Sequence, residues 1–217
     1  INITIDRSPP RVQLNTPLNN TFNLENITFF YNVSDDHSTI QNCTLIVDGL
    51  INQTNTSITR NETLRFNFEN MSQGTHTWQV NCTDHQGNTN GSVFYELTVD
   101  DSPPTVTLHE PISFLNISMN TTVNASAFDA FSGVNVTIFQ FRQNEQSSWN
   151  DLCRADNDTS QYYNCTWDIS SIPEGNFYQI RAFANDSAGH VSTPENATNI
   201  TIDRTAPEIT IVSPEDS

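Results

Sequence analysis

The sequence contains no lysine, so its eight basic residues are all arginines, and with 25 acidic residues the formal net charge is −17. Nucleic acids and anionic membrane surfaces are bound through clustered cations, and the sequence offers no basic patch. The Lys–Asn isopeptide bonds that strengthen many surface adhesins are excluded as well. We therefore expect no nucleic-acid partner, and we expect disulfides to be the cross-links within each domain.

Long apolar runs are also missing. Hydrophobic residues make up 35% of the chain, and no segment approaches the roughly 18 apolar residues that span a bilayer. The sequence has neither a glycine-rich phosphate loop nor a nucleophile elbow, and its five histidines are scattered. We expect no membrane insertion by this segment, no catalytic residues and no enzyme activity.

The chain does contain a repeat. The opening INITIDRSPP returns near the end as TNITIDRTAP, and a weaker copy, LTVDDSPPTVTLHEP, lies between them. Self-similarity at domain-sized spacing indicates a tandem array. The sequence predicts whole domains at residues 8–101 and 102–204. It also predicts the last strand of a preceding repeat at 1–7 and the first strand of a following repeat at 205–217. The expected partners are adjacent repeats of the same chain or like copies.

Asparagine is abundant, and 20 of the 28 asparagines stand in Asn-x-Ser/Thr sequons. Chance would give roughly six such sites in a chain of this composition. An asparagine- and threonine-rich sequence makes some sequons by accident, but the excess favours a surface that carries N-linked glycans. The sequons are at Asn2, Asn19, Asn26, Asn32, Asn42, Asn52, Asn55, Asn61, Asn70, Asn81, Asn90, Asn116, Asn120, Asn124, Asn135, Asn157, Asn164, Asn185, Asn196 and Asn199.

Alternating short segments indicate β-strands. In NITFFYNVS, Phe29 and Tyr31 share one parity while Asn26 and Asn32 share the other, so the sequons would face water. Such segments recur about every ten residues between turn residues, which is typical of an all-β antiparallel sandwich of the immunoglobulin type. The expected strands are 11–15, 26–34, 42–48, 63–68, 75–83 and 93–99, then 105–109, 121–128, 134–142, 162–169, 177–185 and 197–202.

The four cysteines fall two to a domain, without the Cys-x-x-Cys spacing of zinc sites. Cys43 and Cys82 lie on strands that are neighbours in one sheet of an immunoglobulin-like order, both with inward parity. Cys153 and Cys165 flank a segment that is interpreted as a hairpin. We predict the disulfides Cys43–Cys82 and Cys153–Cys165, and with the sequons these place the protein outside the cytoplasm.

The run TWDISSIPEGNFYQIRAFANDSAGH resembles the closing half of bacterial and archaeal immunoglobulin-like surface domains. Those show Trp-Asp, Pro-x-Gly, an aromatic strand and Asp-x-Ala-Gly-Asn, and His190 stands here where asparagine is usual. FDAFSGV resembles the Asp-x-x-Ser-Gly-Val turn of the same domains. The resemblance implies tandem immunoglobulin-like repeats of an N-glycosylated cell-surface protein, and such asparagine-rich, cysteine-paired arrays look most like archaeal ones. The matching residues are Trp167, Asp168, Pro173, Gly175, Tyr178, Ala182, Asp186, Ala188 and Gly189.

The expected function is structural: an extended glycosylated stalk, filament or sheath on the cell surface that takes part in adhesion. The alternative is a carbohydrate-binding or adhesive recognition module of a secreted protein, which would need exposed aromatic side chains. Phe30, Phe139, Phe141 and Trp149 are the candidates for such a platform.

Calcium is the one cofactor that the sequence raises. In an immunoglobulin-like sandwich, the loop after the second strand and the last hairpin lie at the end where the chain enters. Clustered carboxylates at that end suit calcium, whereas short aspartates at turns also bond their own backbone, and both interpretations stay open. The sets are Asp6, Asp35, Asp36 and Asp84 in the first domain, and Asp100, Asp101, Asp129 and Asp186 in the second.

Overall fold

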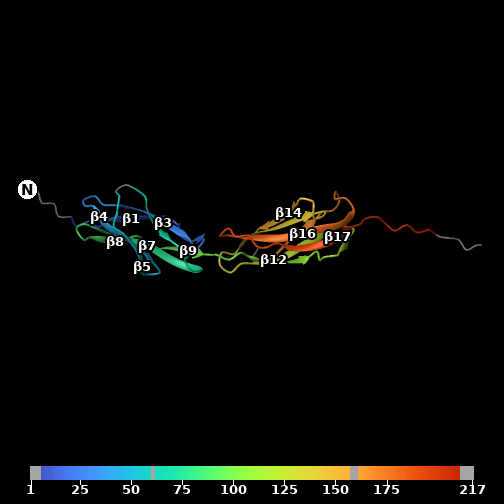
Figure 1. The fold of residues 1–217 in the computed structure, drawn as a ribbon, viewed down its shortest axis with the longest axis horizontal. Helices are drawn as coiled ribbons and strands as arrows, with labels where there is room; N and C mark the ends of the chain where they lie inside the picture. The colour runs from blue at the N-terminus through green and yellow to red at the C-terminus, as the bar shows by residue number, and fades with distance from the viewer. Residues whose placement is uncertain (1–5, 60–61, 157–160, 211–217) are drawn as a thin grey trace, which may run out of the picture. The chain divides into compact units, whose positions relative to one another are not determined.

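The computed structural model describes residues 6–59, 62–156 and 161–210, and its ribbon is drawn in Figure 1. The chain divides into two compact units. Unit 1 comprises Ile1–Ser102 with Ala130–Ser132 and Ser187–His190, and unit 2 comprises Pro103–Asp129, Gly133–Asp186 and Val191–Ser217. Strands joined by turns, bends and irregular loops make up the described residues, with no helix among them, so the fold is all-β. Across these residues no helix long and apolar enough to cross a membrane occurs.

Unit 1 is an immunoglobulin-like sandwich of two sheets. One sheet has the order β1-β3-β6, and the other runs β2-β9-β7-β4-β5 with β8 beside β7. Neighbouring strands are antiparallel except for β2 and β9, which are parallel. The strands are β1 (Arg11–Thr16), β2 (Thr21–Asn23), β3 (Ile27–Ser34), β4 (Ile40–Val47), β5 (Leu50–Asn55), β6 (Leu64–Phe68), β7 (Gly74–Asp84), β8 (Thr89–Gly91) and β9 (Tyr95–Val99).

Unit 2 repeats this topology. A sheet of order β10-β12-β15 faces one of order β11-β17-β16-β13-β14, and the parallel pair is again at the edge, between β11 and β17. The strands are β10 (Thr105–Glu110), β11 (Asn116–Ile117), β12 (Thr121–Phe128), β13 (Val134–Arg142), β14 (Asn150–Asp156), β15 (Tyr162–Trp167), β16 (Gly175–Asp186) and β17 (Glu195–Ile202).

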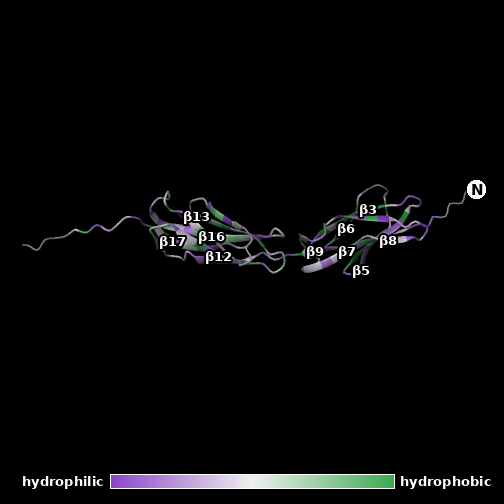
Figure 2. Cartoon of the chain, turned by 180° about the vertical axis from the view of Figure 1, so that it is seen from behind, coloured by the Kyte–Doolittle hydropathy of each residue, from purple (hydrophilic) through white to green (hydrophobic). Residues whose placement is uncertain are grey.

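The core of unit 1 follows the predicted alternation. Along β3, Phe29 and Tyr31 are fully buried while the alternate residues are half-buried or exposed, and Figure 2 shows hydrophobic and hydrophilic residues interleaved in the strands. The ring centroids of Phe29 and Trp78 are 4.8 Å apart. Large aromatic side chains at the sandwich centre each bury a large apolar area between the two sheets.

The core of unit 2 is built around Trp167 and Tyr178, whose ring centroids are 6.2 Å apart. Both side chains are buried, and the Tyr178 hydroxyl donates a hydrogen bond of 2.8 Å to the carbonyl oxygen of Pro173. A tyrosine near the start of this strand that bonds the backbone a few residues upstream is the tyrosine corner of immunoglobulin-like sandwiches. It fixes the loop before β16 on the core.

The predicted disulfide of unit 1 is confirmed. Cys43 on β4 lies directly opposite Cys82 on β7, and both side chains are fully buried. The bond therefore ties two neighbouring strands of one sheet, as the strand order led us to expect.

The disulfide of unit 2 forms between the predicted cysteines, but the hairpin interpretation was wrong. Cys153 lies on β14, which pairs with β13, and Cys165 lies on β15, which pairs with β12 in the opposite sheet. The chain between them thus crosses from one sheet to the other instead of folding back in one. As a result the bond joins the two sheets at their open edge.

The predicted terminal strands lie largely beyond the described part of the chain. Residues 1–5 and 211–217 are outside it, while residues 6–7 and 205–210 are described and form no strand. The strand expected at 1–7 and most of the one expected at 205–217 therefore stay predictions.

Candidate functional site

The links that enter and leave the sandwiches share one local structure. Each begins with an aspartate whose side chain accepts a hydrogen bond from the backbone N–H two residues further on, an Asx turn. The three turns occur at corresponding positions of the repeat, so the repeated residues encode a repeated link geometry. The pairs are Asp6 with Ser8 at 2.9 Å, Asp100 with Ser102 at 3.0 Å and Asp203 with Thr205 at 3.0 Å.

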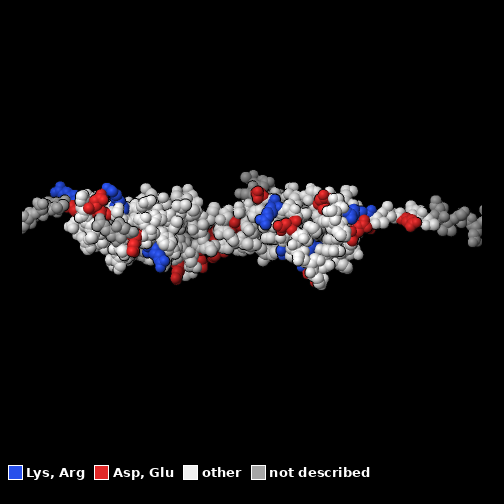
Figure 3. Space-filling model, turned by 90° about the horizontal axis from the view of Figure 1, so that it is seen from above, with Lys and Arg blue, Asp and Glu red and all other residues white. Residues whose placement is uncertain are grey.

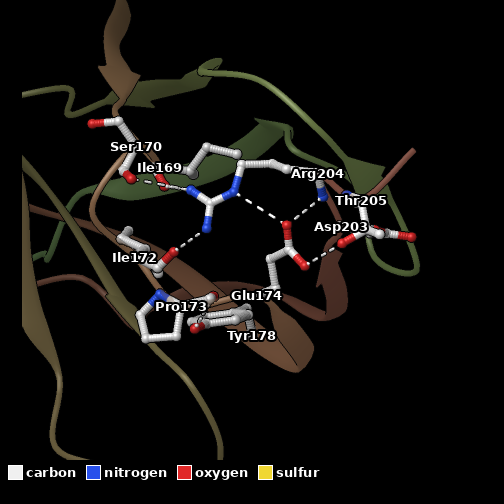
Figure 4. A network of polar contacts seen from close by, with 9 residues as sticks. All are labelled: Ile169, Ser170, Ile172, Pro173, Glu174, Tyr178, Asp203, Arg204 and Thr205. Carbon is white, nitrogen blue, oxygen red and sulfur yellow. Dashed lines mark hydrogen bonds and ion pairs between the residues drawn. The ribbon is translucent and has the colours of Figure 1, made fainter.

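In unit 2 the outgoing link, residues 203–205, is clamped by Arg204 (Figure 4). The Arg204 guanidinium donates to three backbone carbonyls of the loop before β16, and its Nε lies 3.5 Å from Glu174 Oε1. A planar, permanently charged donor group can satisfy several carbonyls at once. The carbonyls belong to Ile169 (2.6 Å), Ser170 (3.1 Å) and Ile172 (2.9 Å).

Glu174 binds the same link from the other side. Its carboxylate accepts hydrogen bonds of 2.9 Å from the backbone N–H of Arg204 and 2.9 Å from the Thr205 hydroxyl (Figure 4). The bond from Thr205, together with those from Arg204, lowers the pKa of Glu174. Arg204 and Glu174 together fix the point at which the chain leaves the sandwich.

Unit 1 holds its outgoing link in a related way. The Gln73 side chain donates to Asp100 Oδ1 at 3.1 Å and to the Ser102 hydroxyl at 2.6 Å. Ser132, which belongs to the same compact unit, donates its backbone N–H and its hydroxyl to Asp100 Oδ2. Burial would raise the pKa of Asp100, but the hydrogen bonds from Ser132, Ser102 and Gln73 outweigh it and lower that pKa.

Of the carboxylates predicted for a calcium site in unit 1, three come together. Oxygen atoms of Asp6, Asp35 and Asp84 lie within 4.8 Å of one another. Asp36 is not among them, because its exposed side chain forms an ion pair with Arg11 at 3.0 Å. Burial opposes ionisation of Asp84, but hydrogen bonds from residues of its own turn lower its pKa; they come from Asn88, Gln86 and Gly87.

The other predicted set does not lie within one unit. Asp100 and Asp101 belong to unit 1, and Asp129 and Asp186 belong to unit 2. Asp101 is exposed, Asp186 is buried, and Asp129 accepts a 2.9 Å hydrogen bond from the backbone N–H of Gly133. A calcium site formed by these four residues stays a prediction.

The sequon asparagines keep out of both cores. Asn2, Asn61 and Asn157 lie outside the described residues, and none of the other seventeen is buried. Three sequons contain a cysteine at the middle position, as in Asn42-Cys43-Thr44. Strand alternation turns Cys43 into the core and Asn42 to the opposite face, so a sequon asparagine and a disulfide occupy adjacent residues.

The aromatic side chains predicted to form a binding platform are not free. Phe139 is fully buried, and Phe141 packs on the core with its ring centroid 5.7 Å from that of Trp167. Trp149 is covered by the guanidinium groups of Arg142 and Arg181, whose central carbons lie 4.4 and 4.3 Å from its ring centroid. Phe30 is half-buried on β3.

An aromatic pair that sequence reasoning missed lies elsewhere on unit 2. Phe114 and Phe177 are 75% and 63% exposed, and they line an open surface pocket with the sequon residue Asn199. All three have positive φ, between 57° and 69°. No periodicity marks these positions, because the left-handed backbone that presents them interrupts the strand pattern.

His76 forms a further polar site in unit 1. Its Nδ1 lies 2.7 Å from Asp48 Oδ2, and its Nε2 lies 2.8 Å from the carbonyl oxygen of Ser72. Both ring nitrogens therefore face acceptors, which only the protonated ring satisfies. Burial would lower the pKa of His76, but the hydrogen bonds to Asp48 and Ser72 raise it.

Comparison with known families and structures matches this architecture. The family model of bacterial Ig-like domains (group 3) matches residues 60–140 and 161–217, and that of the bacterial Ig domain matches residues 104–182. A comparison with curated proteins found no match.

A solved structure of tandem modules shares this fold. The fibronectin(III)-like modules of Clostridium thermocellum CbhA align with a TM-score of 0.56 and 16% identity, over 93% of this chain and 100% of that one. The tetra-tandem repeat in the extending region of a large adhesion protein aligns with a TM-score of 0.41 and 15% identity, over 90% of this chain and 49% of that one. The likeness to the CbhA modules concerns the fold alone, and the second alignment supports no further conclusion.

Proposed function

The chain belongs to the bacterial Ig-like domain family (group 3), and on that basis we propose that it is a mechanical spacer of a glycosylated extracellular stalk, filament or sheath. Bacterial Ig-like domains are generally structural modules without catalytic activity and are typical of surface or adhesion-related proteins. The proposal goes beyond the family in assigning a tensile role, an N-linked glycan coat and a place outside the cell.

The observation that carries the proposal is the anchoring of the outgoing links. Tension along the chain reaches each sandwich through its last strand and the link that follows it. In unit 2 that link is held by the Arg204 guanidinium and the Glu174 carboxylate, and in unit 1 by the Gln73 amide. A link bonded to the loop of its own sandwich resists peeling of the last strand, whereas a binding module needs no such anchor.

The surface supports a glycan coat. In Figure 3 most of the visible surface is neither basic nor acidic, and the described sequon asparagines are exposed or half-buried. Edge strands in this chain have no lysine to discourage pairing with other molecules. Bulky sugars at the sequons would supply that protection and keep neighbouring molecules apart.

A recognition module is the second candidate, favoured by one observation. Phe114 and Phe177 present two exposed rings beside Asn199, and aromatic faces of this kind stack on sugars. A glycan attached to Asn199 would itself cover these rings, so the pair fits a glycoprotein spacer equally well. The double variant Phe114→Ser/Phe177→Ser separates the two, since it abolishes binding of a free glycan only if the rings form a recognition site.

Single-molecule pulling of the full chain from its two ends tests the spacer proposal. We expect one force peak for each sandwich. The disulfides lock 39 and 12 residues, so reduction should lengthen the two extensions by about 13 and 4 nm respectively, at roughly 3.4 Å per residue. Extension without force peaks would contradict a mechanical role. Glycopeptide mass spectrometry of native material tests the coat, which requires sugar on well over about a quarter of the sequons.

A further inference from the structure

Three carboxylates of unit 1 converge from segments far apart in the sequence. Asp6 belongs to the incoming link, Asp35 follows β3, and Asp84 ends β7. Their oxygen atoms lie within 4.8 Å of one another, and Asp35 and Asp84 are buried. Three negative charges this close repel one another strongly unless a cation lies between them.

The hydrogen bonds of the loops do not use all of these oxygens. Asp35 Oδ1 accepts bonds of 2.8 Å from the backbone N–H groups of His37 and Ser38. The residue is only 7% exposed, and its Oδ2 is buried without a hydrogen-bond partner. Asp6 Oδ2 is likewise buried without a partner, while its Oδ1 makes the Asx turn. A buried carboxylate oxygen left unpaired costs free energy, so turn formation explains one oxygen of each residue and not the other.

Neutral side chains hold the cluster together. Asn88 donates to Asp84 Oδ2 at 2.8 Å and to the carbonyl oxygen of Asp6 at 3.4 Å, and Asn90 donates to the carbonyl oxygen of Pro10 at 2.8 Å. Among the described residues, none of the ion pairs that unit 1 forms involves Asp6, Asp35 or Asp84. The incoming link is thus placed over the loops by amides, with the charge of the carboxylates left uncompensated.

We propose that Asp6, Asp35 and Asp84 bind one calcium ion, which locks the incoming link to the two loops of unit 1. The donors are all carboxylate oxygens, which calcium prefers, whereas zinc selects nitrogen and sulfur. Ligands about 2.4 Å from an ion lie at most about 4.8 Å apart, and the three carboxylate oxygens lie within that limit of one another. Magnesium would require oxygens closer to the ion, at about 2.0–2.1 Å, in a stricter octahedron. Water completes the coordination.

Calcium titration of the intact 217-residue chain by calorimetry, with thermal unfolding in calcium and in chelator, tests this site. The informative variants are Asp35→Asn, which removes a charged ligand, and Asp6→Asn, which lies outside every strand and keeps an acceptor for the Asx turn. The matched control is Asp36→Asn, one residue away but paired with Arg11 outside the cluster.

For the unaltered chain we expect a Kd of about 10⁻⁴–10⁻³ M, as in other extracellular modules. At about ten times that concentration, calcium should raise the Tm of unit 1 by roughly 5–10 °C. Asp6→Asn and Asp35→Asn should weaken this binding at least about tenfold, while Asp36→Asn should leave it unchanged.

Three results would overturn the site: a Tm of the unaltered chain that calcium does not change, binding that survives Asp6→Asn, and magnesium binding as tight as calcium. Because Asp6→Asn leaves the sandwich intact, the test does not depend on whether Asp35→Asn folds. The outcome is also independent of the spacer proposal, which requires no metal.

Discussion

Gln73 and Glu174 occupy the same place in their two units, each directly before the glycine that begins the strand beside the last one. Gly74 pairs with Val99 and Gly175 with Ile202, and in both units the preceding side chain hydrogen-bonds the outgoing link. The amide of Gln73 and the carboxylate of Glu174 thus both hold the outgoing link, one as hydrogen-bond donor and the other as acceptor. Gln73 donates to a link that carries Asp100, whereas Glu174 accepts from a link that carries Arg204.

Replacing Arg204 by alanine leaves three loop carbonyls without their charged donor. We expect the free energy of unfolding of unit 2 to fall by about 1.5–3 kcal/mol, measured by urea denaturation followed through tryptophan fluorescence. Arg154→Ala is the matched control, because Arg154 lies 3.8 Å from Asp151 and both side chains are more than half exposed. Its loss should stay below about 0.5 kcal/mol. Equal losses of unfolding free energy in the two variants would show that Arg204 stabilises unit 2 no more than an exposed ion pair does.

Replacing both Cys153 and Cys165 by serine opens the edge at which the two sheets of unit 2 are joined. Closing a loop of 12 residues stabilises by about 3 kcal/mol in the chain-entropy model, and that stability should be lost from unit 2 alone. Unit 1, with its own disulfide, serves as the internal control in the same denaturation curve. A double variant as stable as the original would show that the sheets need no cross-link at this edge.

The contribution of His76 to stability should depend on pH. Its pKa is raised in the folded chain, so its stabilisation is fully present below the unfolded value of about 6.5 and is lost as pH rises through the folded pKa. The pKa of Asp48 is lowered despite partial burial, by the His76 and Thr77 hydrogen bonds. The stabilisation that Asp48 contributes is therefore present above its pKa in the unfolded chain and is lost as pH falls through its pKa in the folded chain.

His76→Gln should accordingly destabilise unit 1 more at pH 5.5 than at pH 8.5, by a difference of about 1 kcal/mol or less because Asp48 is partly exposed. Urea denaturation at the two pH values measures this, with His109→Gln in unit 2 as the control. A cost that is the same at both pH values would mean that the ring acts only through packing.

Sugar occupancy should differ between two sequons of similar exposure. The Asn90 side-chain nitrogen, the atom to which a glycan would be attached, donates at 2.8 Å to Pro10 of the incoming link. Asn116 is exposed at the edge strand β11. We expect lower occupancy at Asn90, and site-resolved glycopeptide mass spectrometry compares the two. Equal occupancy would show that attachment precedes the docking of the link.

The sequence predicted the strands that carry a buried face. Each of the twelve expected segments overlaps one observed strand, because alternation such as that of Phe29 and Tyr31 reflects a sandwich core. Five strands were missed: β2, β5, β8, β11 and β14. β5 shows why, since Leu50 and Ile51 are about three-quarters exposed and the strand is defined only by backbone pairing with β4.

The candidate sites were predictable where local residue types or the expected loop positions sufficed. The Asx turns and the sequon parity follow from local residue types, and Asp6, Asp35 and Asp84 were named from the expected loop positions. The sequence could not predict that the strands of Cys153 and Cys165 belong to different sheets, because no local pattern distinguishes a hairpin from a crossing between sheets. The contacts of Arg204 are made to carbonyls about thirty residues away in the sequence, so no local sequence pattern around Arg204 predicts them.

Three of the four cysteines directly follow a sequon asparagine, at Cys43, Cys82 and Cys165. During biosynthesis, the glycosylating machinery and the oxidising machinery would compete for neighbouring atoms of one extended segment. Once a strand has closed into its sheet, the acceptor beside the disulfide is fixed against a rigid surface. Under the proposal of a glycan coat, sugar occupancy at these three positions would therefore depend on how long each strand stays unfolded before its sheet closes.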